Sequence, residues 1–332
     1  MPQTDLDVIG VGNAIVDVLA KADDAFLAQH DIVKGGMVLI DEEQAKSVYD
    51  AMAPGVEISG GSAANSVACV ASLGGKGGFI GKVADDALGE IFRHDLKALG
   101  VEFSTAPLQN GPATGRCLIN VTPDAQRSMT TFLGAAGYAS IDDIDPDQIA
   151  RAAIIFFEGY LFEPETPRQA FYKAAEIAQK NKRRTALTLS DSGCVERQFD
   201  AFNDFIDQHI DILLANETEA AALFQTGDMN AIIEKAKNTC ELTVVTRSEK
   251  GSILIPREGE VIAIDAVTPE KLEDTTGAGD AYAAGLLFGL AQGFPLARAG
   301  ALGSLAASEV ISHFGARPAQ SLKAMAQSAE LL

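Results

Sequence analysis

The second half of the chain alternates short apolar runs with amphipathic stretches, and this alternation limits the fold more than any other feature. The apolar runs are rich in β-branched and aromatic residues and span residues 152–160, 185–191, 211–216 and 242–247. Amphipathic stretches such as residues 168–184 and 217–225 lie between them. Continuously apolar strands that alternate with helices predict an α/β fold, a mostly parallel sheet covered by helices on both faces.

Polar residues end three of these predicted strands. They are Asp191, Asn216 and Thr246. Ligands of open α/β sheets bind beyond the carboxyl ends of the strands, where the chain turns into the next helix. The three residues are therefore candidates for a binding site.

The first third of the chain has a different pattern. Asn13 and Asp17 interrupt an otherwise apolar run, and residues 35–44 and 114–137 are typical of short alternating strands with turns. We interpret this region as a small β-rich lid built from segments at about 13–45 and 103–135. The remainder of the 1–332 chain would form the α/β core, because no linker or repeat separates the two parts.

The composition of the 332 residues is that of a globular protein, with 47% hydrophobic and 22% charged residues. The 26 basic and 46 acidic residues give a net charge of −20, which argues against nucleic acid or an anionic membrane as a partner. We find no apolar run long enough to span a bilayer and no secretory pattern at the start, so we expect a cytoplasmic protein. An acidic chain that binds phosphate must do so with backbone dipoles, a few cations or a metal.

The four cysteines and four histidines are widely scattered. Their spacing matches neither a zinc site nor a disulfide framework, so we expect buried free thiols. Nothing in the sequence supports a nucleophilic cysteine.

The heptapeptide DTTGAGD, residues 274–280, surrounds one acid with glycines just before an apolar run. Gly277 and Gly279 permit backbone conformations that let N–H groups converge, and a helix starting near Ala278 would add its positive end. The heptapeptide thus predicts an anion site with Asp280 in the first helical turn. The alternative is an acid that only complements the helix dipole, and the heptapeptide alone favours it.

Two further segments combine small or polar residues with an expected helix start. In GGSAANS, residues 60–66, the glycines permit close backbone approach and Asn65 offers a donor and an acceptor. The alternative is a tight turn with Ser62 as N-cap. In NETEA, residues 216–220, Glu219 suits either a helix cap or a water-mediated magnesium site. Taken alone, each segment is explained at least as well by capping.

Together the three segments resemble the signatures of the PfkB/ribokinase family of small-molecule kinases. Their order and spacing match, and the similarity extends from about Leu6 to Pro318. The resemblance implies a ribokinase-like fold with a small lid and an ATP-dependent phosphotransferase that acts on an alcohol group. The closest likeness within the family is to the adenosine kinases, in residues 10–18, 23–44, 112–128, 158–167 and 211–224.

The resemblance also implies roles for individual residues. Asp280 would take the proton from the acceptor hydroxyl, and the N–H groups of Gly277, Ala278 and Gly279 would stabilise the transferring phosphoryl group. The acceptor would be bound by Asn13, Asp17, Met37, Gly61, Ser62, Asn65, Arg127 and Phe162. The nucleotide site would be formed by Asn216, Thr246, Gly251 and Thr276. Glu219 would serve Mg²⁺ through water, and Asp274 a monovalent cation.

Some of these residues have ordinary alternatives. Phe162, or Tyr160 beside it, would wall a nucleobase or simply pack in the core. Arg127 would reach phosphates from the lid or be a surface charge, and Asp274 equally suits a helix start. Met37 stands where adenosine kinases of animals are expected to have a polar residue.

The function implied is transfer of phosphate from ATP to a nucleoside 5′-hydroxyl, with adenosine converted to AMP in purine salvage. ATP is the expected co-substrate, with Mg²⁺ and a further role for K⁺. The alternatives are a sugar kinase acting on ribose, fructose or a keto-deoxy sugar acid, and a nucleoside-binding protein without catalysis. The expected partner is a small-molecule nucleoside or sugar, and the chain would be a monomer or a homodimer.

Overall fold

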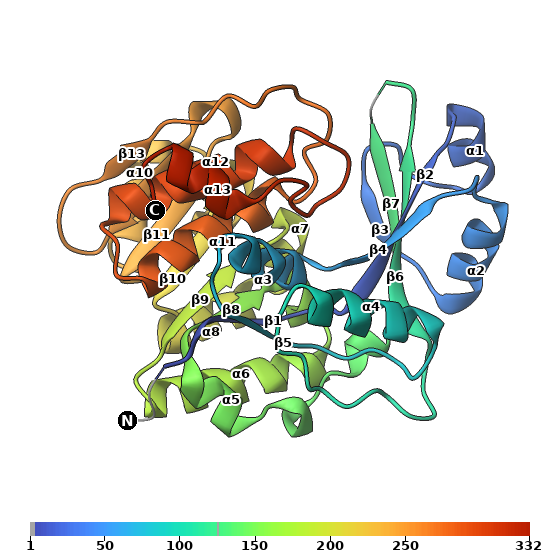
Figure 1. Ribbon diagram of the computed structural model, residues 1–332, viewed down its shortest axis with the longest axis horizontal. Coiled ribbons are helices and arrows are strands. Elements are labelled where there is room, and N and C mark those ends of the chain that lie inside the picture. The colour runs from blue at the N-terminus through green and yellow to red at the C-terminus, as the bar shows by residue number, and fades with distance from the viewer. Residues whose placement is uncertain (1–3, 125) are drawn as a thin grey trace.

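The computed structural model describes residues 4–124 and 126–332. Residues 1–3 and 125 lie outside this description. The first three begin the predicted 1–332 unit, and residue 125 belongs to the predicted lid. Two sheets make up the molecule: a large sheet between layers of helices, and a small sheet beside it (Figure 1).

The large sheet has eight strands. Their order across the sheet is β13 (Ile262–Ile264), β12 (Ser252–Pro256), β11 (Leu242–Thr246), β10 (Ile212–Asn216), β9 (Arg184–Thr188), β8 (Ala152–Glu158), β1 (Leu6–Val11) and β5 (Gly77–Ile80). In this order across the sheet, each neighbouring pair from β11 to β5 is parallel. Strands β12 and β13 continue the sheet beyond β11 by antiparallel pairing. The predicted α/β class and mostly parallel sheet are confirmed.

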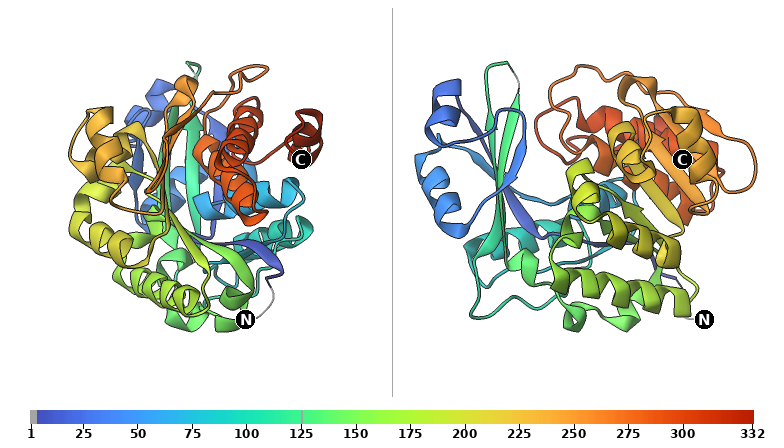
Figure 2. Two further views of the ribbon diagram at one scale, coloured as in Figure 1. Left: turned by 90° about the vertical axis from the view of Figure 1, so that its left-hand side faces the viewer. Right: turned by 180° about the vertical axis from the view of Figure 1, so that it is seen from behind.

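Alternate side chains of each strand enter two separate cores. In β8, Ile154 and Phe156 contact one cluster of buried residues, whereas Ile155 and Phe157 contact the other. Because both faces are covered, the strand is apolar throughout, which is the pattern seen in the sequence. Figure 2 shows the helical layers on either side of the sheet.

The helices of the first core are α3 (Ser62–Ser72), α4 (Ala87–Ala98), α11 (Ala278–Ala291), α12 (Leu296–Val310) and α13 (Leu322–Ser328). Those of the second are α5 (Pro146–Arg151), α6 (Glu165–Lys180), α7 (Ser192–Arg197), α8 (Phe199–His209), α9 (Glu217–Phe224) and α10 (Met229–Ala236). Short 3₁₀ turns are η1 (Ala135–Tyr138), η2 (Ile141–Asp143), η3 (Gly159–Phe162) and η4 (Ser248–Lys250).

The small sheet has five strands, in the order β3 (Met37–Leu39), β7 (Arg127–Gly134), β6 (Thr114–Val121), β2 (Ile15–Lys21) and β4 (Val56–Gly60). Helices α1 (Asp24–Gln29) and α2 (Glu42–Ala51) lie on its outer side (Figure 1), where Val18, Leu27, Val48 and Leu118 pack together. The sheet includes β4, beyond the predicted segment end at residue 45, and residues 103–113 contribute no strand to it.

The chain crosses between the sheets next to the residues singled out by the sequence. Asn13 lies between β1 and β2, and Gly61 between β4 and α3. None of the described helices has both the length and the apolar character needed to cross a membrane. All four cysteines are buried free thiols, as expected.

Candidate active site

Two cavities meet at the start of α11. The first, of about 580 Å³, lies between the small sheet and the carboxyl ends of the large-sheet strands. The second, of about 590 Å³, lies on the other side of the turn. Their shared lining residues are Thr246, Thr275, Ala278, Gly279 and Tyr282. A group bound at this turn can therefore be reached from both cavities.

The turn is built by a left-handed glycine and has no side-chain cap. Gly277 precedes the helix with φ of 76°, and a Cβ there would lie 2.7 Å from the Cα of Ala316. A Cβ on Gly279 would have no protein atom within 4 Å, so this glycine keeps space open for something other than the chain. The N–H groups of the first helical turn have no intrahelical acceptor, which suits anion binding.

Asp280 lies in this first turn and lines the first cavity. Ser62 donates its hydroxyl to one carboxylate oxygen at 2.6 Å, and Asn65 donates its amide to the other at 3.1 Å. Burial raises the pKa of Asp280, whereas these two donors lower it. The N-cap of α3 is Gly61, not Ser62, so the capping alternative for Ser62 is wrong; its hydroxyl orients Asp280.

Asp17 and Asn13 line the same cavity from the small-sheet side. Both are buried, and burial raises the pKa of Asp17 to about 7. Asn13 donates its backbone N–H and side-chain amide to Glu158, and its Oδ1 atom has no partner within the described chain. Gly61 has φ of 94°, and a Cβ there would lie 2.1 Å from the carbonyl oxygen of Asn13. This close approach joins the two segments.

Glu158 is a site residue that the sequence reasoning missed. It ends β8, is fully buried, lines the first cavity and also accepts from the N–H of Ala63 at 2.8 Å. Burial raises its pKa to about 7. The signal was available, because Glu158 is the polar residue at the end of a predicted strand, as are Asn216 and Thr246.

Arg127 extends from the start of β7 to the segment before α11. Its guanidinium donates to Thr276 Oγ1 at 2.7 Å, pairs with the buried carboxylate of Asp274, and lies 4.9 Å from the ring centre of Phe314. Arg127 is thus no free surface charge. Asp274 also accepts from the N–H groups of Thr276 and Gly315, at 2.9 and 2.8 Å. A cation at this carboxylate would have to compete with these donors.

The start of α9 is a complete capping box. Asn216 accepts from the N–H of Glu219 at 2.8 Å, and Glu219 accepts from the N–H of Asn216 at 3.0 Å and from its side-chain amide at 2.6 Å. Both residues line the first cavity, and burial raises the pKa of Glu219 to about 7. The capping alternative is therefore present in the structure, beside the cavity.

Phe162 was wrongly predicted to wall the acceptor. Its ring is fully buried in the second core, 4.6 Å from the ring centre of Phe202 and 5.3 Å from that of Phe205. The 3₁₀ turn η3 directs Phe162 into the core, whereas Tyr160 in the same turn lines the cavity. Aromatic clustering in the core, which adjacent sequence cannot reveal, explains the error.

An apolar wall on the small sheet completes the first cavity. Its members are Ile15, Met37, Leu39, Cys117, Ile119, Met129 and Leu133. Met37, predicted to bind the acceptor, lines this cavity. Gly251, predicted for the nucleotide site, lines the second cavity, and Thr246 lines both.

The first cavity is strongly acidic. Among the described residues, its carboxylates are those of Asp17, Glu158, Glu163, Glu219 and Asp280, and its single Lys or Arg is Arg127. Within the described chain, no three His, Cys, Asp or Glu residues form a group that could hold a metal ion. This arrangement can offer a hydrated Mg²⁺ a single carboxylate, which would contact the ion through water.

The family described as pfkB family carbohydrate kinase matches residues 33–323 of this chain. The chain belongs to this family. Adenosine kinase from Sinorhizobium meliloti is 46% identical and superposes with a TM-score of 0.93, covering 98% of this chain and all of that one. A probable sugar kinase from Rhizobium etli is 42% identical with a TM-score of 0.95, covering 99% of this chain and all of that one. Adenosine kinase 2 from Arabidopsis thaliana is 26% identical, covering 93% of this chain and 94% of that protein.

The pfkB kinase described here is therefore a phosphotransferase that acts on a hydroxyl group, with ATP as co-substrate. Its relatives support a nucleoside or a sugar as the acceptor. Its ribokinase-like fold is the one predicted.

Proposed function

We propose that this kinase phosphorylates the 5′-hydroxyl of adenosine or a closely similar nucleoside. The observation that carries the proposal is the divided lining of the first cavity. Seven apolar side chains line its small-sheet wall beside Asp17, whereas Ser62 and Asn65 contact Asp280 and Asn13 contacts Glu158. A nucleobase, which can pack an aromatic ring face on the apolar wall, joined to a ribose matches both parts, since ligand sites combine apolar walls with a few placed polar groups.

A bare sugar would leave the apolar wall without a partner. A sugar acid would meet a further difficulty, because its carboxylate needs a cation. In the part of the chain that the structure describes, the one Lys or Arg lining the first cavity is Arg127, and its guanidinium is engaged with Asp274 and Thr276. A neutral acceptor with an apolar portion is therefore the better match.

In the proposed reaction, Asp280 orients the acceptor hydroxyl and takes its proton as the hydroxyl oxygen attacks the γ-phosphorus of ATP. The bond between that phosphorus and the bridging oxygen of ADP breaks, and ADP leaves. Ser62 and Asn65 hold the two oxygens of Asp280, so the carboxylate keeps one orientation toward the cavity. A base needs only modest strength here, because the transition state is loose and the proton leaves late.

The turn at Gly277, Ala278 and Gly279 supplies the other requirement, stabilisation of charge on the transferring phosphoryl group. The N–H groups of Gly277 and Gly279 are the better placed donors, since Ala278 donates to the carbonyl of Thr275 at 3.3 Å. ATP would occupy the second cavity, beside Thr246 and Gly251.

Mg²⁺ would neutralise phosphate charge when it is bound with ATP. Asn216 and Glu219 are the residues that would hold it, through water. Their mutual cap uses one acceptor position on each Glu219 oxygen, and a carboxylate oxygen has a second, so a bound water can be accommodated. The small sheet would close as a lid that excludes water, and Arg127 on β7 would then exchange Asp274 for phosphate.

The test is ATP consumption measured against adenosine, other nucleosides, ribose, fructose and a keto-deoxy sugar acid. We expect turnover with adenosine. Turnover with a sugar and none with any nucleoside would overturn the acceptor. Binding of adenosine without phosphorylation at any Mg²⁺ concentration would indicate a binding protein instead.

A pair of variants ties the acceptor to the apolar wall. Met129→Ala removes part of the wall and should raise the KM for adenosine. Val56→Ala, on the exposed edge strand of the same sheet, should leave that KM unchanged. Equal effects of the two substitutions would argue against a base seated on this wall.

A further inference from the structure

Arg317 is a half-buried cation behind the acceptor site, and none of the roles described above uses it. Its Nε atom donates to Asn65 Oδ1 at 3.3 Å, and its Nη1 atom donates to the hydroxyl of Ser59. Its Nη2 atom is buried and has no partner within the described chain. Arg317 does not line the first cavity, so it does not itself meet the acceptor in this structure.

We propose, on the basis of the function above, that Arg317 is a positioning residue: it fixes the orientation of Asn65 toward Asp280 and keeps a positive charge beside Asp17. The proposal has a geometric part and an electrostatic part, and each can be tested separately.

The geometric part follows from what each group can donate or accept. An ionised Asp280 can only accept, and a guanidinium can only donate. Asn65 lies between them, with its NH₂ group toward Asp280 and its oxygen toward Arg317. Rotating the amide by half a turn would place oxygen against carboxylate and NH₂ against guanidinium. Arg317 therefore selects the one orientation that holds Asp280.

The electrostatic part concerns Asp17. The Asp17 carboxylate lies against Gly60, where a Cβ would be 2.3 Å from its Cγ atom, and Arg317 contacts Ser59, the residue before Gly60. The charges near Asp17 are Arg317 on the C-terminal segment, Arg127 on β7 and Asp280 on α11, with the Cys117 thiol on β6. The pKa of Asp17 is raised to about 7, mainly by burial and also by Asp280, and Arg317 is the larger of the two cationic influences that oppose this rise. Without Arg317, more of Asp17 would be protonated at neutral pH, and a neutral carboxyl accepts less strongly from the acceptor hydroxyls than a carboxylate.

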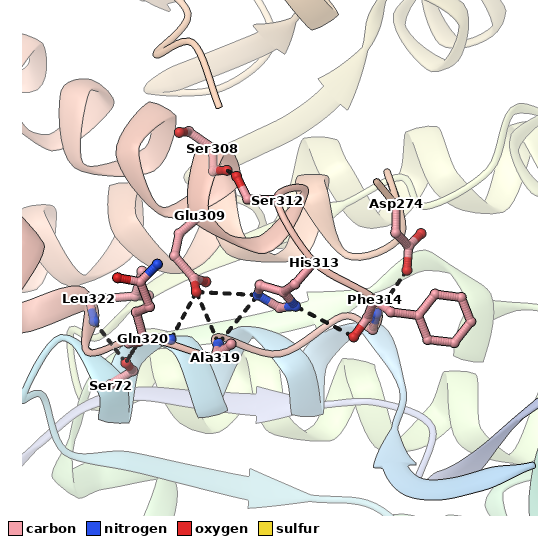
Figure 3. Close-up of polar contacts among 11 residues, drawn as sticks. Ser72, Asp274, Ser308, Glu309, Ser312, His313, Phe314, Ala319, Gln320 and Leu322 are labelled. Atoms are coloured by element: carbon pink, nitrogen blue, oxygen red, sulfur yellow. Dashed lines mark hydrogen bonds and ion pairs between the residues drawn. The ribbon is translucent and has the colours of Figure 1, made fainter. Parts of the chain in front are cut away.

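The position of Arg317 is set by bonds on both sides of it. Gly315 donates to Asp274 at 2.8 Å, which joins the segment to the anion turn. After Arg317, the N–H groups of Ala319 and Gln320 donate to the buried carboxylate of Glu309 at 3.0 and 2.9 Å (Figure 3). The side of the guanidinium away from Asn65 is held through Ser59, whose hydroxyl donates to Asp95 at 2.8 Å. A flexible surface arginine would not be tied in this way.

A double-mutant cycle tests the geometric part. With the acceptor identified above, Arg317→Met and Asn65→Ala should each lower kcat by about tenfold or more, and the double variant should lose little beyond the larger single loss. Fully additive losses would overturn the proposal. Arg257→Met, the same substitution outside both cavities, is the control for kcat and thermal unfolding. Should Arg317→Met fail to fold, Arg317→Lys replaces it in the cycle.

The pH profile tests the electrostatic part. Arg317→Met should move the acid limb of kcat/KM for the acceptor to higher pH, whereas Arg317→Lys, which retains the charge, should restore the limb without fully restoring kcat. An unchanged limb in Arg317→Met would overturn this part, because a purely structural role would not move it.

A titration of carboxylate ¹³C signals needs no substrate and separates this proposal from the proposed function. The Asp17 signal, assigned with Asp17→Asn, should titrate at higher pH in Arg317→Met than in the unaltered protein. If no acceptor is phosphorylated but this shift is seen, the proposed function fails and the placement of charge by Arg317 stands. If the signal does not shift, the electrostatic part fails whatever the acceptor.

Discussion

Two helices begin beside the first cavity with an acid in their first turn, yet they begin in opposite ways. The start of α9 is closed by a reciprocal capping box between Asn216 and Glu219. The start of α11 has a left-handed glycine, no side-chain cap and an open space beside Gly279. A helix end that satisfies its own N–H groups has little to offer a ligand, whereas one that leaves them free beside a cavity is ready for an anion. Similar motifs in sequence thus prepare different chemistry.

The largest effect is expected at Asp280, the acid in the first turn of α11, whose start we call the open start. Asp280→Asn should lower kcat by about 10²–10⁴-fold, because the acceptor hydroxyl loses its proton acceptor. Adenosine and ATP should still bind, which calorimetry can measure. Near-normal turnover in Asp280→Asn would show that Asp280 is not the base. The acids at the starts of α9 and α11 would then not differ in catalytic role.

Glycine substitutions test the shape of the open start. Gly277→Ala should lower the free energy of unfolding by about 1–3 kcal/mol, since the left-handed conformation is strained and the new Cβ meets Ala316. Gly293→Ala is the matched control, because its φ is 74° but its Cβ would meet no atom within 4 Å. The difference between the two variants measures the collision alone.

Gly279→Ala separates ligand space from protein packing. Its Cβ would enter open space, so stability should be unchanged or rise by up to about 1 kcal/mol, whereas kcat should fall at least about tenfold as the phosphoryl group is crowded. Thermal unfolding and kcat measured together decide this. A variant that keeps full kcat would show that the open space is not used.

The pH dependence distinguishes the carboxylates near the two starts. The pKa of Asp17 is raised to about 7, so protonation below that pH should lower kcat/KM for the acceptor, by about tenfold per pH unit for a single group. Asp17→Asn should reduce kcat/KM at pH 8 and make the acid limb shallower. The pKa of Glu219 is also raised to about 7, yet Glu219→Gln should retain the limb. If Glu219→Gln removes the acid limb of kcat/KM and Asp17→Asn retains it, the limb belongs to Glu219 at the start of α9.

The smallest effect is expected at the closed start. Glu219→Gln should raise the Mg²⁺ concentration needed for half-maximal activity about tenfold, the lower end of the loss seen for outer-shell metal contacts. Asn216→Ala should mainly cost about 1 kcal/mol of stability through the lost cap. An unchanged Mg²⁺ requirement in Glu219→Gln would leave the α9 start with capping as its only role.

The strands and helices of the second half were predictable, because their signal is local. Predicted strands at 152–160 and 211–216 correspond to β8 and β10, and the helix expected over 168–184 corresponds to α6. The lid was placed only approximately, because β4 joins the small sheet by pairing with β2, a contact that its own few residues do not encode.

The position of Asp280 at the first turn of α11 was likewise predictable, since a glycine turn followed by an apolar helix is written in consecutive residues. Glu158 could have been found, because it is a polar residue near the end of a predicted strand, whereas the sequence held no signal against Phe162. Which side chain of a strand-end turn enters the cavity depends on the neighbouring helices, and the sequence of residues 158–162 does not contain them.

The sequence by itself determined the class of sheet, the two glycine turns and the family, because these depend on residues close together in the chain. Tertiary structure decided which distant groups meet. Glu158 reaches Asn13 across 145 residues, and Arg317 reaches Asn65 across 252. Such pairs leave no periodic trace, since each partner is a single side chain placed by a different element. The carboxylate at α11 is encoded locally, whereas the groups that orient it are brought together only by the fold.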